Sequence, residues 1–502
     1  MLDKDNSVKK TGVVTKEASV TTKNISKVVL LKVVQYPFVA LSVMLIPRMM
    51  GPEIYGDYAL LTSIVVIAAS IVDFMGYTNI FGRFVPEFEI RGESGNIRKL
   101  FSNILSLKIV VDLIASVVLF AILHFTYGDR FPSPYFLLVV GVLLVGDLGS
   151  VPWTLLFGLN QLGKFALRDP IRKVLSLAFT LILFHYYGLS GAIMAYLLVE
   201  FSLALLYFFW TRKYFQVEDF RLDLFFLRPY LRFGFLFYVS HGLSDLWPRL
   251  GNPLILYITQ DSREVALFDI PNQIFLFAVG ITLVAIGYLV PVFTEFLSTG
   301  KEGKLMEWST LIIKYTSVLC MITFWAFILT GRDLIPVVIG SKYNEIFLNG
   351  VVLLLGIFPM IIYELGVVFS VIYKEPRKYF LALCFALLAF LIASMWLIPK
   401  YSSLGCAIAT LISCVVLALV MCIAFKGKLY PCLVDGFKVI IISFVFVPFL
   451  FIRGTPINNF LLLGCLILAY ALMLFAGKVL SLREIKNIVF AVRHQSEESV
   501  RV

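Results

Sequence analysis

The sequence predicts an all-α integral membrane protein. Of its 502 residues, 60% are hydrophobic and only 15% are charged, and the mean hydropathy is +0.91. This composition lies far outside the range of soluble domains of similar length. Apolar windows of about 20 residues, which match a hydrocarbon core of roughly 30 Å, recur from residue 28 to residue 477. These windows are too long for the strands of a membrane barrel, so we expect spanning helices.

We predict fourteen transmembrane helices, arranged as two six-helix lobes with two extra C-terminal helices. The expected spans are 28–47, 58–81, 102–125, 135–157, 174–187, 190–211, 232–258, 265–294, 309–331, 346–373, 379–398, 403–425, 436–453 and 459–477. The expected domains are a cytoplasmic tail (1–27), an N-terminal lobe (28–211), a cytoplasmic linker (212–231), a C-terminal lobe (232–425), helices 13 and 14 (426–477) and a second cytoplasmic tail (478–502).

The distribution of basic residues predicts the orientation in the membrane. The chain holds 43 Lys and Arg residues, and most lie in the tails and in alternate loops. The opposite loops hold Arg48, Arg130, Arg263, Arg332, Lys342, Lys400 and Arg453. Since cytoplasmic loops are enriched in Lys and Arg, both termini are predicted to be cytoplasmic, in a plasma (inner) membrane. The net charge of +11 is spread over many short loops, which indicates membrane lipids rather than nucleic acid as a partner.

An internal repeat supports the two-lobe prediction. "FVPEFEIRGESGNIRKL" (84–100) aligns without a gap with "LVPVFTEFLSTGKEGKL" (289–305), and this alignment pairs Gly95 with Gly300. Two shorter similarities follow in the same order: "RDPIRK" (168–173) with "KEPRK" (374–378), and "GLSGAI" (188–193) with "SLGCAI" (403–408). The shared order indicates a duplication. Because each unit contains an even number of spans, the two units have the same orientation and form a parallel repeat.

Ionisable residues interrupt the seventh predicted span at "HGLSDLWPRL" (241–250). His241, Asp245 and Arg249 follow one another at i, i+4 steps and share one helical face. A charge at the bilayer centre costs a few kcal/mol or more, so this face is not expected to contact lipid. Pro248 is expected to break the helix. The stretch predicts the wall of a polar cavity; the alternative is an internal Asp245–Arg249 ion pair that fixes helix packing.

Metal and cofactor chemistry is not predicted. The seven cysteines all lie in the later part of the chain without a C-x-x-C pair, and small buried apolar residues account for them. The four histidines are scattered, and no H-E-x-x-H motif occurs. We therefore expect no metal site, no cofactor and no catalytic residue.

A long motif near the N-terminus resembles a known family. "IPRMMGPEIYGDYALLTSIVVIAASIVDFMGYTNIFGRFVPEFE" (46–89) is similar to the opening of Wzx-type polysaccharide-biosynthesis (O-antigen) flippases. The match rests on Pro47, Arg48, Gly51, Pro52, Glu53, Tyr55, Gly56, Tyr58, Asp73, Gly76, Arg83, Pro86 and Glu87. The resemblance implies the multidrug/oligosaccharidyl-lipid/polysaccharide exporter (MOP) superfamily, with a central cavity between spans 1, 2, 7 and 8.

The polar residues of those four spans are the candidate site. For substrate binding we predict Arg249, His241, Arg83, Lys32, Arg48, Asn79, Gln35, Asn272 and Gln273. As ion-coupling or cavity carboxylates we predict Asp245, Asp269 and Asp73. Lys32 and Arg83 lie near predicted span ends, where snorkelling to the interface is the alternative. Asp147, Glu200 and Glu364 lie in other spans, where structural hydrogen bonding is favoured over binding of a cation or proton.

The resemblance and the cationic cavity together predict a flippase for polyprenyl-diphosphate-linked oligosaccharide in surface polysaccharide synthesis. Arginine binds diphosphate through bidentate hydrogen bonds. The resemblance implies undecaprenyl as the carrier, and further expected partners are a coupling cation or proton and the polysaccharide polymerase machinery. Two alternatives stay open: a cation-coupled exporter of small molecules, and a membrane glycosyltransferase or polymerase. The short predicted outer loops disfavour an enzyme.

Overall fold

The protein is a bundle of helices. The structure, a computed structural model, describes residues 3–72, 77–215, 222–287, 290–444 and 456–476, and these residues contain no strand. The main helices are α1 (Asp3–Val72), α2 (Tyr77–Ile90), α3 (Ser94–Tyr127), α4 (Ser133–Gly158), α5 (Leu162–Ala166), α6 (Arg168–Thr211), α7 (Leu224–Leu246), α8 (Gly251–Thr259), α9 (Ser262–Gly287), α10 (Val290–Ser298), α11 (Glu302–Val338), α12 (Ile346–Leu355), α13 (Ile357–Ile372), α14 (Pro376–Ala424), α15 (Lys426–Ser443) and α16 (Pro456–Ala476). The predicted all-α class is confirmed.

Seven helical segments of the described chain are long and apolar enough to cross a membrane. They are Val34–Val72, Ser94–Tyr127, Ser133–Gly158, Leu162–Tyr214, Glu302–Val338, Ile346–Ile372 and Pro376–Ala424. Three of them contain a residue with non-helical backbone angles, namely Gly51, Gly188 and Ser402. Each of these breaks falls between two predicted spans. The protein is therefore a multi-pass membrane protein, and the total of fourteen spans stays a prediction.

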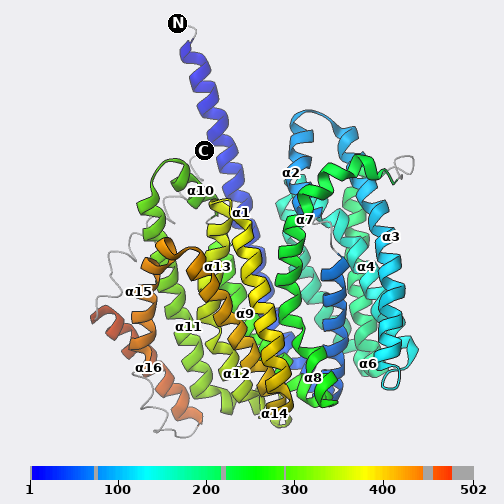
Figure 1. The fold of residues 1–502 in the computed structure, drawn as a ribbon, viewed down its shortest axis with the longest axis vertical. Helices are drawn as coiled ribbons and strands as arrows, with labels where there is room; N and C mark the ends of the chain where they lie inside the picture. The colour runs from blue at the N-terminus through cyan, green and yellow to red at the C-terminus, as the bar shows by residue number, and fades with distance from the viewer. Residues whose placement is uncertain (1–2, 73–76, 216–221, 288–289, 445–455, 477–502) are drawn as a thin grey trace.

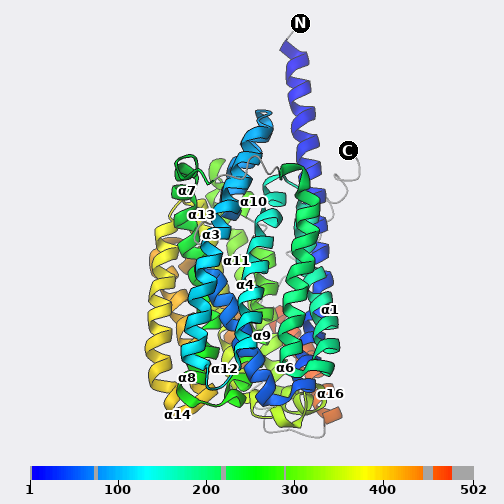
Figure 2. The same cartoon turned by 90° about the vertical axis from the view of Figure 1, so that its right-hand side faces the viewer.

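The helices pack as two groups that lie side by side (Figure 1). In the N-terminal lobe, α4 packs against α2, α3 and α6; in the C-terminal lobe, α14 packs against α12 and α13, and α11 packs against α15. Helix α1 contacts both lobes, through α6 on one side and α9 on the other. Its N-terminal part projects beyond the bundle (Figures 1 and 2). We call the opposite end, where α8 lies, the far end.

The backbone preserves the internal repeat and corrects its register. Gly92 and Gly300 both have φ 70°, and in each case the next residue donates a hydrogen bond of 2.8 Å to the carbonyl five residues earlier. This is the geometry that ends a helix at a left-handed residue. Gly92 is therefore the counterpart of Gly300, so the ungapped sequence alignment that paired Gly95 with Gly300 is wrong by three residues. Asn160 (φ 53°) and Lys374 (φ 59°) form a second such pair.

The breaks in α6 and α14 form a third pair. Gly188 (φ 58°, ψ −139°) and Ser402 (φ 50°, ψ −126°) adopt nearly the same angles. Three residues later, a Cβ atom on Gly191 would lie 2.0 Å from the carbonyl oxygen eight residues earlier, and one on Gly405 would lie 2.3 Å from the corresponding oxygen. The turn requires glycine at both positions. It pairs Gly191 with Gly405, one residue away from the pairing that the sequence similarity suggests.

Candidate functional site

A cavity of about 510 Å³ lies between the two lobes. Its charged lining residues are Asp147, Arg168, Arg172 and Glu200 from the N-terminal lobe and Asp245, Arg249 and Glu364 from the C-terminal half of the chain. Its polar and aromatic lining includes Ser70, Tyr77, Ser150, Trp153, Tyr196, Ser244, Trp247 and Tyr363. We call this space the central cavity. It offers three guanidinium groups and four carboxyl groups inside an otherwise apolar bundle.

The break in the seventh predicted span supplies one wall of the central cavity. Helix α7 ends at Leu246, a single 3-10 turn covers Trp247–Arg249, and α8 begins at Gly251. Pro248 lies within this turn, where its missing N–H group and fixed φ favour a departure from the α-helix. Both Asp245 and Arg249 line the cavity, in agreement with the cavity-wall interpretation.

Two arginines of α6, Arg168 and Arg172, line the same cavity as Arg249. The Arg172 guanidinium lies 2.6 Å from a Glu200 carboxylate oxygen and donates a hydrogen bond of 2.8 Å to the Tyr196 hydroxyl. Arg168 lies 3.9 Å from the same carboxylate, and its guanidinium stacks 4.1 Å above the Trp153 ring. The Glu200 side chain is only 4% exposed. One buried carboxylate thus holds two cations in place at the cavity wall.

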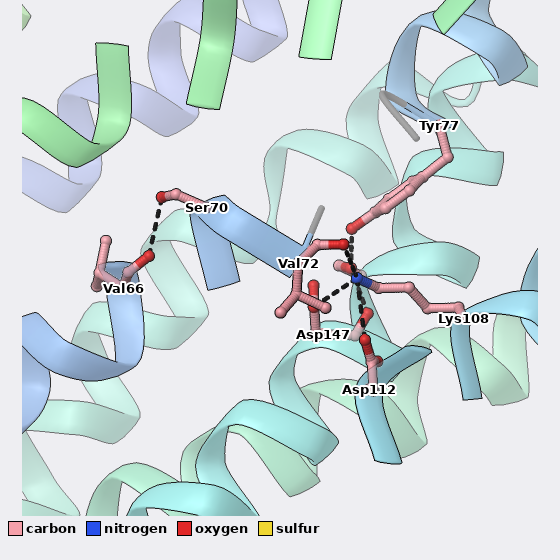
Figure 3. Close-up of polar contacts among 8 residues, drawn as sticks. Val66, Ser70, Val72, Tyr77, Lys108, Asp112 and Asp147 are labelled. Carbon is pink, nitrogen blue, oxygen red and sulfur yellow. Dashed lines mark hydrogen bonds and ion pairs between the residues drawn. The ribbon is translucent and has the colours of Figure 1, made fainter. Parts of the chain in front are cut away.

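A second buried charge cluster adjoins the cavity on its N-terminal-lobe side (Figure 3). The Lys108 ammonium lies 2.5 Å from an Asp147 oxygen and 3.2 Å from an Asp112 oxygen, and the side chains of Lys108 and Asp112 are fully buried. The ammonium also donates to the Val72 carbonyl at 3.4 Å and lies 5.7 Å from the centre of the Tyr77 ring. We call Lys108, Asp112 and Asp147 the Lys108 triad.

A hydrogen-bonded network joins the two lobes around Asp269. This carboxylate, 1% exposed, accepts hydrogen bonds from the Tyr55 hydroxyl (2.9 Å), the Asn252 amide (2.8 Å) and the Gln273 amide (2.6 Å). Asn252 also donates to the Ser63 hydroxyl at 2.7 Å. Tyr55 and Ser63 lie on α1, whereas the other three residues lie on α8 and α9. The Asp269 network therefore fixes α1 to the C-terminal half of the chain.

A more exposed contact lies beside the Asp269 network. Arg130, in the connection between α3 and α4, lies 3.3 Å from Asp57 and donates to the Ser262 hydroxyl at 2.6 Å and to the Gln260 carbonyl at 3.3 Å. Ser262 in turn donates to Asp57. A Cβ atom on Gly56 would lie 1.8 Å from the Ser262 carbonyl oxygen, so the backbones touch here. We call Asp57, Arg130 and Ser262 the latch.

The predicted site residues occupy several different places. Arg249 and Asp245 line the central cavity, while Asp269 and Gln273 belong to the Asp269 network. Asn272 donates to the Pro248 carbonyl at 3.1 Å, and Arg48 donates to the Val337 carbonyl at 2.9 Å. Arg83 is exposed and pairs with Glu87 at 3.3 Å. Gln35, Arg48 and Arg83 are not among the cavity-lining residues. Asp73 and the side chains of Lys32, Asn79 and His241 lie outside the described part of the chain.

Two lobes of membrane-spanning helices around a charged cavity are an arrangement typical of membrane transporters. Residues 21–297, more than half of the chain, match the family model described as "Polysaccharide biosynthesis protein". The chain belongs to this family, in agreement with the resemblance seen in its N-terminal motif. No curated protein sequence matches the chain.

Solved structures share the fold at low sequence identity. The lipid II flippase MurJ in an inward closed conformation is 16% identical, with a TM-score of 0.67 over 90% of this chain and 100% of that one. An inward-facing multidrug resistance MATE family transporter of the MOP superfamily is 17% identical, with a TM-score of 0.59 over 79% and 95%. The Vibrio cholerae MATE transporter VcmN in the bent form is 15% identical, with a TM-score of 0.53 over 82% and 99%. The predicted MOP superfamily fold is confirmed.

Proposed function

We propose that the protein is a flippase that moves polyprenyl-diphosphate-linked oligosaccharide across the plasma membrane for surface polysaccharide synthesis. The observation that supports this most strongly is the central cavity, which is lined by Arg168 and Arg172 of the N-terminal lobe and by Arg249 of the C-terminal half, in a member of a polysaccharide biosynthesis family. A hydrated glycan and a diphosphate do not cross hydrocarbon unaided, because transfer of unpaired polar groups and charges out of water is costly. The apolar polyprenyl tail can remain in the hydrocarbon core and does not need the cavity.

The charges of the cavity suit an anionic head group with attached sugars. One carboxylate, Glu200, is shared by Arg168 and Arg172, and Asp147 is paired with Lys108. The guanidinium groups therefore retain N–H donors that can bind a phosphate group. Arginine donors in a fork geometry bind phosphate oxygens through paired hydrogen bonds. The aromatic rings in the lining, such as Trp153, supply flat apolar faces for sugar rings. The proposed cycle moves the cargo without covalent chemistry.

The contacts between the lobes support a cytoplasm-facing state. The Asp269 network and the latch hold the lobes together toward the far end. The basic loops predict that the opposite end, from which α1 projects, is cytoplasmic. In this proposal the cargo enters from the cytoplasmic leaflet, and separation of the lobes at the Asp269 network and the latch releases it on the other side.

Deletion of the gene tests the proposal directly. Polyprenyl-linked intermediates are extracted and identified by mass spectrometry, and their leaflet is assigned with a membrane-impermeant sugar-modifying reagent. We expect a complete lipid-linked repeat unit to accumulate in the inner leaflet. Complementation with Arg249→Ala should fail although the protein reaches the membrane, whereas Arg83→Ala, an exposed arginine outside the cavity, should restore export. An unchanged pool and sidedness after deletion would refute the flippase function.

A cation-coupled exporter of small organic molecules is the second candidate. The carboxyl groups of the cavity favour it, because Asp147, Asp245 and Glu364 could attract a cationic compound. The assay is accumulation of cationic dyes in cells with and without expression. Dye efflux that depends on expression, together with an unchanged pool of lipid-linked intermediates, would favour this candidate over the flippase.

A further inference from the structure

The Lys108 triad buries two carboxyl groups with a single ammonium group. Lys108 and Asp112 have fully buried side chains, and the side chain of Asp147 is 6% exposed. If all three groups are ionised, two carboxylates share one ammonium, and one negative charge is left over. An uncompensated charge in a low-dielectric interior is among the most costly arrangements in a protein, and such groups are retained where they have a function.

We propose that the triad is a proton-binding site in which Asp112 and Asp147 share one proton, and in which the Lys108 ammonium holds the position that a sodium ion would otherwise take. One bound proton makes the triad electrically neutral. A hydronium ion in the central cavity gives up the proton, so one of its O–H bonds breaks and a neutral water molecule remains. A new O–H bond forms on an oxygen of Asp147, and the proton is shared with Asp112 through a hydrogen bond. The proposal rests on the proposed function only where it calls this proton a coupling ion.

The route for the proton follows from the lining of the cavity. Asp147, Tyr77 and Ser150 all line the central cavity, whereas Lys108 and Asp112 do not. The Tyr77 and Ser150 hydroxyls are hydrogen-bonded to each other, and Ser150 also donates to the Asp147 carbonyl. Asp147 is thus the member of the triad that contacts the cavity. Figure 3 shows Asp147 and Asp112 beside the Lys108 ammonium.

The groups around the triad leave it as the site with excess negative charge. From α1 the Val72 carbonyl faces the ammonium, and from α2 the Tyr77 ring does. From α6, the charge of Arg168 attracts Asp147 along the same cavity wall, but its ion pair, at 3.9 Å, is with Glu200. Asp223, which caps the start of α7, forms an ion pair with Lys99 of α3. Lys99 precedes Lys108 by nine residues, so this pair is separate from the triad. Asp73 lies outside the described residues.

Lys108 explains why a proton rather than a metal ion is favoured. A metal cation needs several oxygen ligands at close range. The oxygens available here, from Asp112, Asp147 and the Val72 carbonyl, already surround the ammonium. A second cation among them would be repelled at short distance in a medium of low dielectric constant. Removal of the ammonium would leave a pocket of oxygens with two negative charges.

The triad also lies at one end of the helix that joins the lobes. Val72 is the last residue of α1, and the same helix carries Tyr55 and Asp57, which bond to the C-terminal half of the chain and to Arg130. A change of charge at the Val72 end can therefore reach the far-end contacts through one rigid element. This arrangement gives the bound proton a mechanical connection to the opening of the lobes.

Thermal unfolding of the purified full-length protein in detergent tests the role of Lys108. Sodium chloride is compared with choline chloride at equal ionic strength, in the absence of cargo. The wild type should show no sodium-specific shift, while Lys108→Ala should gain a sodium-specific rise in Tm of about 3 °C or more, since a ligand that binds only the folded state stabilises it. A sodium-specific rise in the wild type, or none in folded Lys108→Ala, would overturn the proposal.

Infrared difference spectroscopy between neutral and alkaline pH tests the shared proton, because exposed carboxyl groups are ionised at both pH values. It does not depend on the folding of Lys108→Ala. The wild type should show the band of a protonated carboxyl group, and Asp112→Asn should lose it. Asp435→Asn, which removes a partly exposed carboxylate paired with Lys438, is the matched control and should keep the band. An unchanged band in Asp112→Asn would refute the shared proton. Both measurements use protein without cargo, so their failure would leave the flippase proposal untouched.

Discussion

The Asp269 network and the Lys108 triad both bury a carboxylate in the bundle, but they satisfy it in different ways. Asp269 accepts from three neutral donors that come from both lobes. Asp112 and Asp147 share an ammonium with partners that all belong to the N-terminal half of the chain. Hydrogen bonds to a charged group contribute about 1.5–3 kcal/mol each, while removal of one partner of a buried ion pair costs roughly 3–5 kcal/mol. The Asp269 contacts between the lobes thus contain no cation, and the cluster of opposite charges lies within one lobe.

Removal of Lys108 should give the largest effect on stability. Lys108→Ala leaves two buried carboxylates without their cation, so we expect a loss of roughly 3–5 kcal/mol in sodium-free buffer. Thermal unfolding in detergent measures it. Lys99→Ala is the matched control, because the Lys99–Asp223 pair is about half exposed and such pairs contribute at most about 1 kcal/mol. Equal losses in the two variants would remove the contrast between buried and exposed lysines.

Crowding of the interface between the lobes should have the second-largest effect. Gly56→Ala places a Cβ atom 1.8 Å from the Ser262 carbonyl oxygen. Because this distance is far shorter than a van der Waals contact, the lobes must move apart at this point. We expect most glycan export to be lost, as measured by surface-glycan staining. Gly95→Ala is the control, because its Cβ would meet no atom within 4 Å. Full export by Gly56→Ala would show that the contact at the far end tolerates separation.

Loss of the Asp269 carboxylate should weaken the contact between the lobes at the far end without introducing a steric clash. Asp269→Ala leaves the donors of Tyr55, Asn252 and Gln273 without their shared acceptor, at a cost of about 1–3 kcal/mol to the closed far end. In a cysteine-free background, a reporter at Ala59→Cys, a buried position on α1 beside the network, should then react faster with a membrane-impermeant thiol reagent. An unchanged rate would mean that the network does not hold the lobes together.

Removal of the latch should have the smallest effect on the stability of the closed far end. The side chains of Arg130 and Asp57 are 31% and 22% exposed, so water screens their attraction and Arg130→Ala should cost at most about 1 kcal/mol. We expect the same reporter to react only slightly faster than in the wild type, and the difference to shrink as salt is added. A larger effect than that of Asp269→Ala would reverse the ranking of the two contacts.

The sequence by itself determined the features that depend on local patterning. Composition and 20-residue apolar windows established the membrane class, because hydrocarbon thickness sets the length of a span. Breaks at Gly51, Gly188 and Ser402 fall where the pattern ends one span and begins the next. Pro248 predicted the broken helix that brings Arg249 to the cavity wall. Each of these features follows from residues close together in the chain.

Only the tertiary structure decided which polar side chains meet. Arg168 belongs to a repeat motif in the sequence, but its partner Glu200 lies one span further along the chain. Lys108 lies within an apolar stretch, and no local pattern indicates its pairing with Asp147. The sequence placed Asp269 in the cavity set, whereas the fold bonds it to Tyr55, more than two hundred residues away. Pairings across helices leave no periodic trace in the chain, because they depend on how whole helices are rotated and stacked.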